Sequence, residues 1–297
     1  MMFPAAAYRI PVLVADEKGY FKDANIELSK VPQPNNMQGV QALISTKSQV
    51  GMMSMPTVIQ AVLAGSEAKI FCGGLDVLQT TLIAKPGSTL PSTYDGASWD
   101  EVVKSFDGKK IGSQTPIGSG FQILLQKALE EAGATNMTFV NIGGANDLAL
   151  AALNKGTVDV ALSSPPGTQS LIVDKSVKRL AYPAEHSKTY GLYGSAYTAP
   201  TEWLTSKPGT AKGFCDAIDK SLAYINDPKN TDEVAAIYVK DSGVSKDVAT
   251  LVVKDTFGDD YSTDLPEERL QETFDTLVKL GVVPSNPGYD AMVAPVQ

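Results

Sequence analysis

Long apolar runs, clustered basic residues and clustered metal ligands are all missing from this 297-residue chain. No segment approaches the roughly 18 consecutive apolar residues that a membrane-spanning helix needs. The formal net charge is −8 and no basic stretch stands out, which argues against nucleic acid as the partner. The two cysteines, Cys72 and Cys215, fit no metal-ligand spacing. The sequence therefore predicts neither a metal site nor a cofactor.

The compartment of the protein is left open by the same residues. Cys72 and Cys215 are compatible with one disulfide in an oxidising compartment or with two free buried thiols, because sequence fixes no geometry. Residues 1–9 lack the basic region and the long apolar region of a secretory leader. We expect either a cytoplasmic protein or a chain that has been processed or trimmed.

Recognisable catalytic groupings are missing too. The single histidine, His186, lies in the polar segment PAEHSKTY with no candidate nucleophile beside it. The acidic pairs at 130–131, 259–260 and 267–268 adjoin expected helices or loops and are typical of solvated charge. The sequence alone therefore predicts a protein that is not an enzyme.

Alternating strand and helix signals fill most of the chain and predict an α/β fold of two domains. Expected strands lie at 26–31, 49–53, 69–74, 80–85, 109–113, 137–142 and 158–164. Expected helices lie at 12–20, 39–46, 57–64, 120–133 and 145–156. A segment rich in Gly, Ser, Thr and Pro, residues 86–105, interrupts this alternation and indicates a boundary between two lobes.

A similarity between two segments of the chain supports two similar lobes. Residues 43–56 read LISTKSQVGMMSMP and residues 153–166 read LNKGTVDVALSSPP, with four identities at a shift of 110 residues. Each segment combines a helix, a turn, a buried strand and Ser-x-Pro. The remainder after residue 201 is mainly helical, at 211–225, 232–240, 246–256 and 266–280, and we expect it to complete the first lobe.

Four segments in order resemble the nitrate/sulfonate/taurine (NMT1/THI5-like) substrate-binding proteins of ABC transporters. They are PVLVADEKGYFKDANIEL, ALISTKSQVGMMSMPTVIQAVLAG, FDGKKIGSQTPIGSGFQILLQKALEEAG and ALAALNKGTVDVALSSPP. The resemblance covers residues 4–205 and extends to the wider group that includes pyrimidine-precursor proteins of thiamine synthesis. The synthases of that group use a cysteine-rich stretch and an active-site histidine, neither of which is matched here. The family's full first strand is also not matched, since only residues 1–3 precede the first loop.

The resemblance implies a periplasmic-binding-protein type II fold, in which two crossover strands join two α/β lobes around a ligand cleft. Lobe I would comprise residues 1–88 and 196–297, and lobe II residues 89–195. It also implies a monomeric extracytoplasmic protein, free in the periplasm or lipid-anchored, whose partners are a small-molecule ligand and a membrane permease.

Ligands of open α/β sheets bind beyond the carboxyl ends of the strands, where helices begin. In lobe I this rule selects the loop and strand-end residues Tyr8, Arg9, Ser54, Met55, Gly73, Gly74 and the crossover residue Tyr193. Pro11 suits the first turn of a helix because its missing N–H is one of the unpaired donors there. The alternatives are that Arg9 points to solvent, Tyr8 and Met55 pack in the core, and Ser54 forms a plain turn.

In lobe II the loop SQTPIGSGF offers hydroxyls and flexible backbone at a helix start. The same rule selects Thr115, Gly118, Ser119, Gly120, Phe121, Ser164 and Pro165. A helix start favours an anionic group such as a carboxylate or a sulfonate, although an ordinary helix cap is the alternative. We therefore predict capture of a small organic anion. The alternative is a pyrimidine-precursor binding protein, or a synthase-like enzyme on the same fold.

Overall fold

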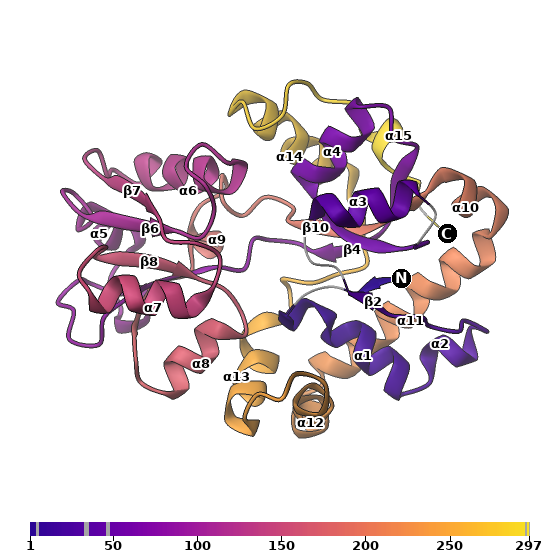
Figure 1. Ribbon diagram of the computed structural model, residues 1–297, viewed down its shortest axis with the longest axis horizontal. Coiled ribbons are helices and arrows are strands. Elements are labelled where there is room, and N and C mark those ends of the chain that lie inside the picture. Colours follow the sequence, from indigo (N-terminus) through magenta and orange to yellow (C-terminus); the bar gives the residue numbers. More distant parts are fainter. Residues whose placement is uncertain (4–5, 33–35, 46–47, 295, 297) are drawn as a thin grey trace. The chain divides into compact units, whose positions relative to one another are not determined.

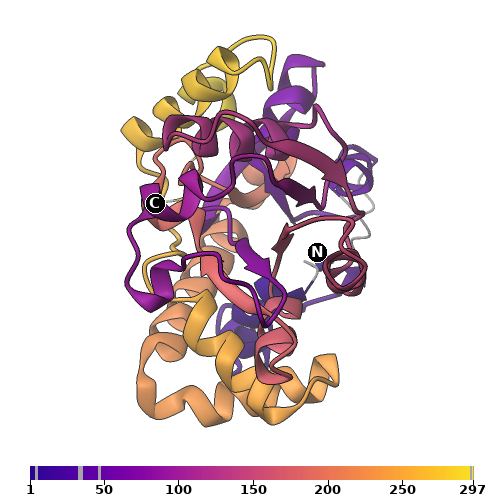
Figure 2. The ribbon, with the colours of Figure 1, turned by 90° about the vertical axis from the view of Figure 1, so that its left-hand side faces the viewer.

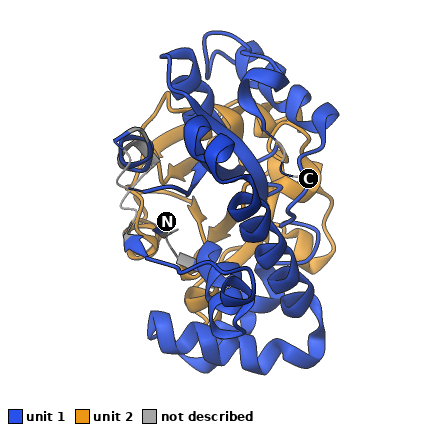
Figure 3. Cartoon of the chain, turned by 90° about the vertical axis from the view of Figure 1, so that its right-hand side faces the viewer, with its two compact units in different colours: residues 1–77, 193–297 blue, residues 78–192 orange. Residues whose placement is uncertain are grey.

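The computed structural model describes residues 1–3, 6–32, 36–45, 48–294 and 296, which form two compact units (Figures 1 and 3). Unit 1 comprises residues 1–77 and 193–297, and unit 2 comprises residues 78–192. The sequence placed these boundaries at 88/89 and 195/196. The first boundary lies earlier because the strand at 81–84 pairs with strands of unit 2. None of the described helices is long and apolar enough to cross a membrane.

Unit 1 is built on short strands and many helices. Its strands are β1 (Met2–Phe3), β2 (Val31–Pro32), β3 (Gly51–Ser54), β4 (Ala68–Leu75) and β10 (Ser195–Pro200). β1 and β2 pair in parallel, and β10 lies between β3 and β4, antiparallel to both. Only the last residue of the expected strand at 26–31 is in a strand. In this register Ser195 faces both Ser54 and Leu75, so these three residues share one edge of the sheet.

The helices of unit 1 come from both segments of the chain. The first contributes η1 (Ala6–Arg9), α1 (Ile10–Glu17), α2 (Tyr20–Asp23), α3 (Asn36–Ile44) and α4 (Met55–Leu63). The second contributes α10 (Thr201–Ser206), α11 (Pro208–Asn226), η3 (Pro228–Asn230), α12 (Thr231–Ser242), α13 (Lys246–Thr256), α14 (Glu267–Lys279) and α15 (Tyr289–Met292). The C-terminal helices therefore belong to the first lobe, as the sequence indicates.

An aromatic core joins α11 to the sheet of unit 1. The Phe214 ring lies 5.1 Å from the Tyr197 ring, 5.4 Å from the Phe21 ring and 5.7 Å from the Phe71 ring. Cys72 of β4 and Cys215 of α11 form a disulfide beside this cluster. The question that the sequence leaves open is thus answered in favour of the disulfide, which ties the two chain segments of unit 1 together.

Unit 2 is a five-stranded sheet with helices between its strands (Figures 1 and 2). Its strands are β5 (Thr81–Ala84), β6 (Lys110–Ser113), β7 (Thr138–Asn141), β8 (Val160–Ser163) and β9 (Lys178–Ala181), in the order β7-β6-β8-β5-β9. Its helices are η2 (Thr93–Asp95), α5 (Trp99–Lys104), α6 (Gly120–Glu131), α7 (Asn146–Asn154), α8 (Gly167–Val173) and α9 (Pro183–His186). β6 is parallel to β7 and β8, whereas β5 is antiparallel to β8 and β9.

Candidate functional site

The carboxyl edge of the parallel strands in unit 2 is the first candidate site. β7 lies on one side of β6 and β8 on the other, so the chain reverses its direction across the sheet at β6. In open α/β sheets the ligand binds at such a switch point, because the loops on its two sides diverge there. The loop after β6 and the segment after β8 are therefore the expected ligand-binding segments of unit 2.

Two amide side chains connect these loops through a hydrogen-bonded cluster. The Asn146 Oδ1 accepts from Ser163 Oγ (2.7 Å) and from the Ser164 N–H (3.0 Å), and its Nδ2 donates to the Ser164 carbonyl (3.2 Å). Gln114 Nε2 donates to Asn146 Oδ1 (3.2 Å), and Gln114 Oε1 accepts from Ser164 Oγ (2.7 Å). Thr168 Oγ1 donates to Ser163 Oγ (2.9 Å). We call these five residues the switch-point cluster.

Three helices begin at this edge without a side-chain cap on their first turns. They are α6, α7 and α8, whose N-cap residues Ser119, Ala145 and Pro166 accept no hydrogen bond there from a helix N–H. By contrast, α5 has a complete capping box, formed by Ser98 and Glu101. Uncapped first turns leave N–H donors and the positive ends of helix dipoles available to a ligand.

The loop between β6 and α6 and the start of α6 hold five of the residues that the sequence selects. Ser119 Oγ donates to Thr115 Oγ1 (2.8 Å), so this hydroxyl braces the loop and does not cap α6. Gly118 has a φ of +83°, which favours glycine, and its N–H donates to Gln122 Oε1 (2.8 Å). Gly120 and Phe121 are the first two residues of α6.

The segment after β8 is shaped to admit the Asn146 side chain. Ser164 belongs to the switch-point cluster, and the buried Pro165 is joined to Pro166 by a cis peptide bond. A Cβ at Gly167 would lie 2.0 Å from Asn146 Nδ2, so only glycine leaves room for the amide. The structure thus brings Ser164 and the loop of Thr115 to one edge.

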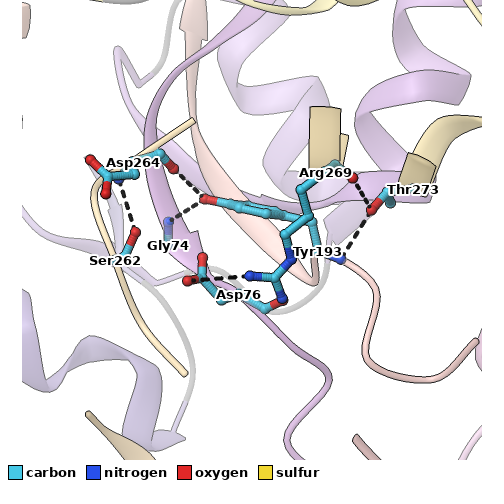
Figure 4. Close-up of polar contacts among 7 residues, drawn as sticks. All are labelled: Gly74, Asp76, Tyr193, Ser262, Asp264, Arg269 and Thr273. Atoms are coloured by element: carbon cyan, nitrogen blue, oxygen red, sulfur yellow. Dashed lines mark hydrogen bonds and ion pairs between the residues drawn. The ribbon is translucent and has the colours of Figure 1, made fainter. Parts of the chain in front are cut away.

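A second candidate site lies in unit 1 at the end of β4 (Figure 4). Asp76 directly follows β4 and is 92% buried (8% exposed). Its Oδ2 lies 3.6 Å from Arg269 Nη1 of α14, and Arg269 Nη2 also donates to the Asp76 carbonyl. Its Oδ1 is buried and has no hydrogen-bond partner among the described residues. The carboxylate is therefore only partly satisfied.

Burial raises the pKa of Asp76 to about 6, against the opposing effect of the Arg269 guanidinium. The carboxylates of Asp264 and Asp260 add to the rise in the pKa, whereas the nearby Tyr193 hydroxyl opposes it. Such a shift, produced by desolvation beside a specific charge partner, is typical of functional sites.

Tyr193 makes hydrogen bonds that connect the segments around this second site. Its hydroxyl donates to the Asp264 carbonyl (2.8 Å) and accepts from the Gly74 N–H (3.4 Å), and its own N–H donates to Thr273 Oγ1 (3.1 Å). Burial raises the pKa of its phenol. The residue is 2% exposed, so in this conformation Tyr193 packs within unit 1.

The two glycines that the sequence selects in β4 lie close to the backbone of other segments of the chain. A Cβ at Gly73 would lie 2.4 Å from the Ser262 carbonyl oxygen, and one at Gly74 would lie 2.6 Å from the Ser195 carbonyl oxygen. The close approach that was expected for a ligand is thus used by segments of the chain itself. Ser54 is at the same edge, where its Oγ is 2.8 Å from Thr57 Oγ1. Met55 is fully buried.

The two selected residues of the first loop make contacts within unit 1. Tyr8 is half-buried and packs on the core of unit 1. Arg9 precedes α1 and forms an ion pair with Asp241 of α12, at 2.7 Å between Nη2 and Oδ2. The guanidinium thus has an acidic partner 232 positions later in the chain.

The sequence reasoning missed Gln114, Asn146, Asp76 and Arg269. The two amides directly follow a strand or begin a helix at the switch point, so the rule that selected their neighbours could have included them. Asp76 carried a weaker signal, as a single acid at the end of an apolar strand. Among the described residues, no group of three or more His, Cys, Asp or Glu side chains could hold a metal ion. His186 stacks on Trp99 at 5.5 Å between ring centroids.

The family profile described as "NMT1/THI5 like" matches residues 6–231. Two curated fungal relatives are both named 4-amino-5-hydroxymethyl-2-methylpyrimidine phosphate synthase. The one from Candida albicans (strain WO-1) is 24% identical over 74% of this chain and 64% of its own length. The one from Uromyces fabae is 23% identical over 76% of this chain and 66% of its own length. The chain thus spans less than two thirds of either relative.

Solved structures show the same α/β fold of the periplasmic-binding-protein kind. The alkanesulfonate-binding protein SsuA from Xanthomonas axonopodis pv. citri, bound to MOPS, matches with a TM-score of 0.74 at 18% identity, over 98% of this chain and 96% of SsuA. The periplasmic aliphatic sulphonate binding protein SsuA from Escherichia coli gives 0.77 at 18% identity, over 97% and 89%. A mutant of DSZB in complex with biphenyl-2-sulfinic acid gives 0.70 at 15% identity, over 99% and 96%.

The prediction that the chain is not an enzyme is contradicted by these relatives. Both curated proteins are named for a synthase activity, and they match about three quarters of this chain. DSZB, a desulfurization enzyme, has the same fold. The missing catalytic groupings in the sequence were therefore no ground for excluding an activity, because this fold serves both binding proteins and enzymes.

Proposed function

We propose that this chain, which belongs to the NMT1/THI5-like family, binds a small organic molecule through an oxyanion group at the switch-point cluster. The observation that carries the proposal is that three helices start at one sheet edge without side-chain caps. Their N–H groups, together with the hydroxyls and amides of the cluster, provide donors for a negatively charged group. No Lys or Arg belongs to the cluster, so recognition would depend on these local dipoles.

The ligands and names of the similar proteins support an oxyanion on an organic body. MOPS is a sulfonate, biphenyl-2-sulfinic acid is a sulfinate, and the curated relatives are named for a pyrimidine phosphate. These groups share a compact set of oxygens around sulfur or phosphorus, which suits several N–H donors at once. The proposed ligand class is accordingly an organic sulfonate, sulfinate or phosphate ester.

In the first form of this proposal, the protein delivers its ligand to the permease of an ABC importer outside the cytoplasm. The sulfonate-binding neighbours support this role. The Cys72–Cys215 disulfide supports an oxidising compartment, since such bonds persist mainly outside the cytosol. Ligand contacts that stabilise one arrangement of the protein would supply the free energy for recognition by the permease.

A second candidate function is an enzyme that forms or modifies a phosphorylated pyrimidine. The observation that favours it is the shared synthase name of both curated relatives. Mass spectrometry of each bound compound, after prolonged incubation with saturating protein, separates the two. A compound recovered unchanged supports capture and delivery, whereas a converted compound supports the enzyme.

The proposal is tested by substituting Asn146 with aspartate. Asn146→Asp keeps the shape of the side chain but adds a negative charge where the uncapped helices begin. We expect the Kd of a bound alkanesulfonate, measured by calorimetry, to rise at least 30-fold, which corresponds to about 2 kcal/mol. Asn154→Asp, at the exposed end of the same helix, is the matched control and should leave the Kd unchanged. Equal affinities for both variants would reject this site.

A further inference from the structure

Asp76 is a buried carboxylate whose neighbours do not satisfy its full hydrogen-bonding capacity. Its Oδ1 has no partner among the described residues. Its Oδ2 faces Arg269 Nη1 at 3.6 Å, longer than the roughly 2.7–2.9 Å of a charge-assisted hydrogen bond. Native proteins pair almost all buried polar atoms, and leaving one unpaired costs about 1–3 kcal/mol. A carboxylate kept in this state needs an explanation.

The charges that face Asp76 leave a local excess of negative charge. Asp264 and Asp260, on the segment before α14, both act on Asp76, and among the described residues Arg269 is the one cation that does so. The remaining capacity of the carboxylate therefore suits a donor that is cationic or carries a polar N–H. An acceptor or an additional anion would be repelled.

The position of Asp76 at the end of its strand also points to a ligand. It follows β4 directly, at the edge where Ser54 ends β3 and Ser195 begins β10. Its side chain is 12% exposed, which leaves the carboxylate within reach of a small group. A half-turn about the Cβ–Cγ bond of Asp76 exchanges its two carboxylate oxygens, so either oxygen can occupy the more exposed position.

We infer that Asp76 is a ligand-binding residue of unit 1, which accepts a hydrogen bond from an amino or amidine group on the bound molecule. Arg269 is then a positioning residue, which holds the Asp76 backbone and orients its carboxylate. The inference concerns unit 1 alone and goes beyond the proposed function, which concerns the sheet edge of unit 2. The molecule bound at Asp76 would carry an N–H donor, as an alkylamine, an amidine or an aminopyrimidine does.

Two matched pairs of probes test the inference. Taurine and propane-1-sulfonate share the oxyanion and differ in one amino group, and 4-aminopyrimidine and 4-methylpyrimidine differ in the same way without an oxyanion. We expect the amino member of at least one pair to bind wild-type protein tenfold or more tightly. In Asp76→Asn this preference should fall below twofold. The control is Asp259→Asn, which alters an exposed acid on the segment before α14 and should retain the preference for the amino probe.

The possible outcomes separate this inference from the proposed function. If both sulfonates bind with equal affinity and 4-aminopyrimidine is not preferred over 4-methylpyrimidine, Asp76 is not a ligand-binding residue, and the oxyanion site stands. If 4-aminopyrimidine alone binds and depends on Asp76, the inference holds and the oxyanion proposal fails. If no amino probe is preferred, or if the preference survives in Asp76→Asn, the inference is overturned.

A pH series on wild-type protein gives a second readout that does not depend on a variant. The preference for the amino probe should weaken as the pH falls from 7 to 5, because the ionised carboxylate is the better acceptor and its pKa is about 6. A preference that stays constant across this range would count against Asp76.

Discussion

Loss of the Cys72–Cys215 disulfide should destabilise unit 1, and the size of the effect follows from the loop that it closes. The bond joins β4 to α11 across 143 residues. In the chain-entropy treatment, closing a loop of this length in the unfolded chain is worth about 5 kcal/mol at 25 °C. All of unit 2, residues 78–192, lies within the loop. If unit 2 stays folded, only residues 73–77 and 193–214 are flexible, and the value falls to about 3.5 kcal/mol.

Urea unfolding of oxidised and reduced wild-type protein, followed by circular dichroism, measures this difference without any substitution. A loss near 5 kcal/mol would indicate that the two units unfold together, and a loss near 3.5 kcal/mol that unit 2 unfolds separately. Cys72→Ala/Cys215→Ala should reproduce the reduced protein, with a small further loss of packing because Cys72 is fully buried. A change in the free energy of unfolding below about 1 kcal/mol would refute the reasoning.

Three further perturbations test individual contacts. The pKa of Asp76 is raised from 3.8 to about 6, so between these pH values the folded state holds a proton that the unfolded state has lost. The free energy of unfolding of wild-type protein, relative to that of Asp76→Asn, should therefore increase by about 2–3 kcal/mol as the pH falls from 7 to 4. Parallel stability profiles of the two proteins would contradict this. Gly167→Ala should destabilise unit 2 by about 2–3 kcal/mol in thermal unfolding by displacing Asn146, whereas Gly87→Ala, which meets no neighbour, should not. Tyr193→Phe removes the hydroxyl that donates to Asp264 and should cost about 1 kcal/mol in urea unfolding; an unchanged midpoint would deny that bond a role.

The order of the elements and the edge that carries the candidate site could be predicted from the sequence. The repeated segment identified β3 and β8, because buried strands that end in Ser-x-Pro leave a local pattern. The strand-end rule selected Ser164 and the loop of Thr115, which the structure brings to the switch point. These features are local in sequence, and local patterns are what periodicity and turn residues report.

The contacts that define the second candidate site are not local. Arg269 reaches Asp76 across 193 positions, and Arg9 meets Asp241 across 232. Which acid approaches which base is decided by helix packing, which no pattern within a short window encodes. Gly73 illustrates a related limit: a glycine that permits close approach does not reveal whether the approaching group is a ligand or another segment of the chain.

The most direct test of the proposed oxyanion site is to map a bound alkanesulfonate by its effect on backbone N–H groups. Titration of ¹⁵N-labelled protein with propane-1-sulfonate should shift the amide signals at the starts of α6, α7 and α8, near Gly120, Asn146 and Gly167. The shifts should saturate together with a single Kd and should vanish in Asn146→Asp. Saturable binding that leaves these three helix starts unperturbed would contradict the account.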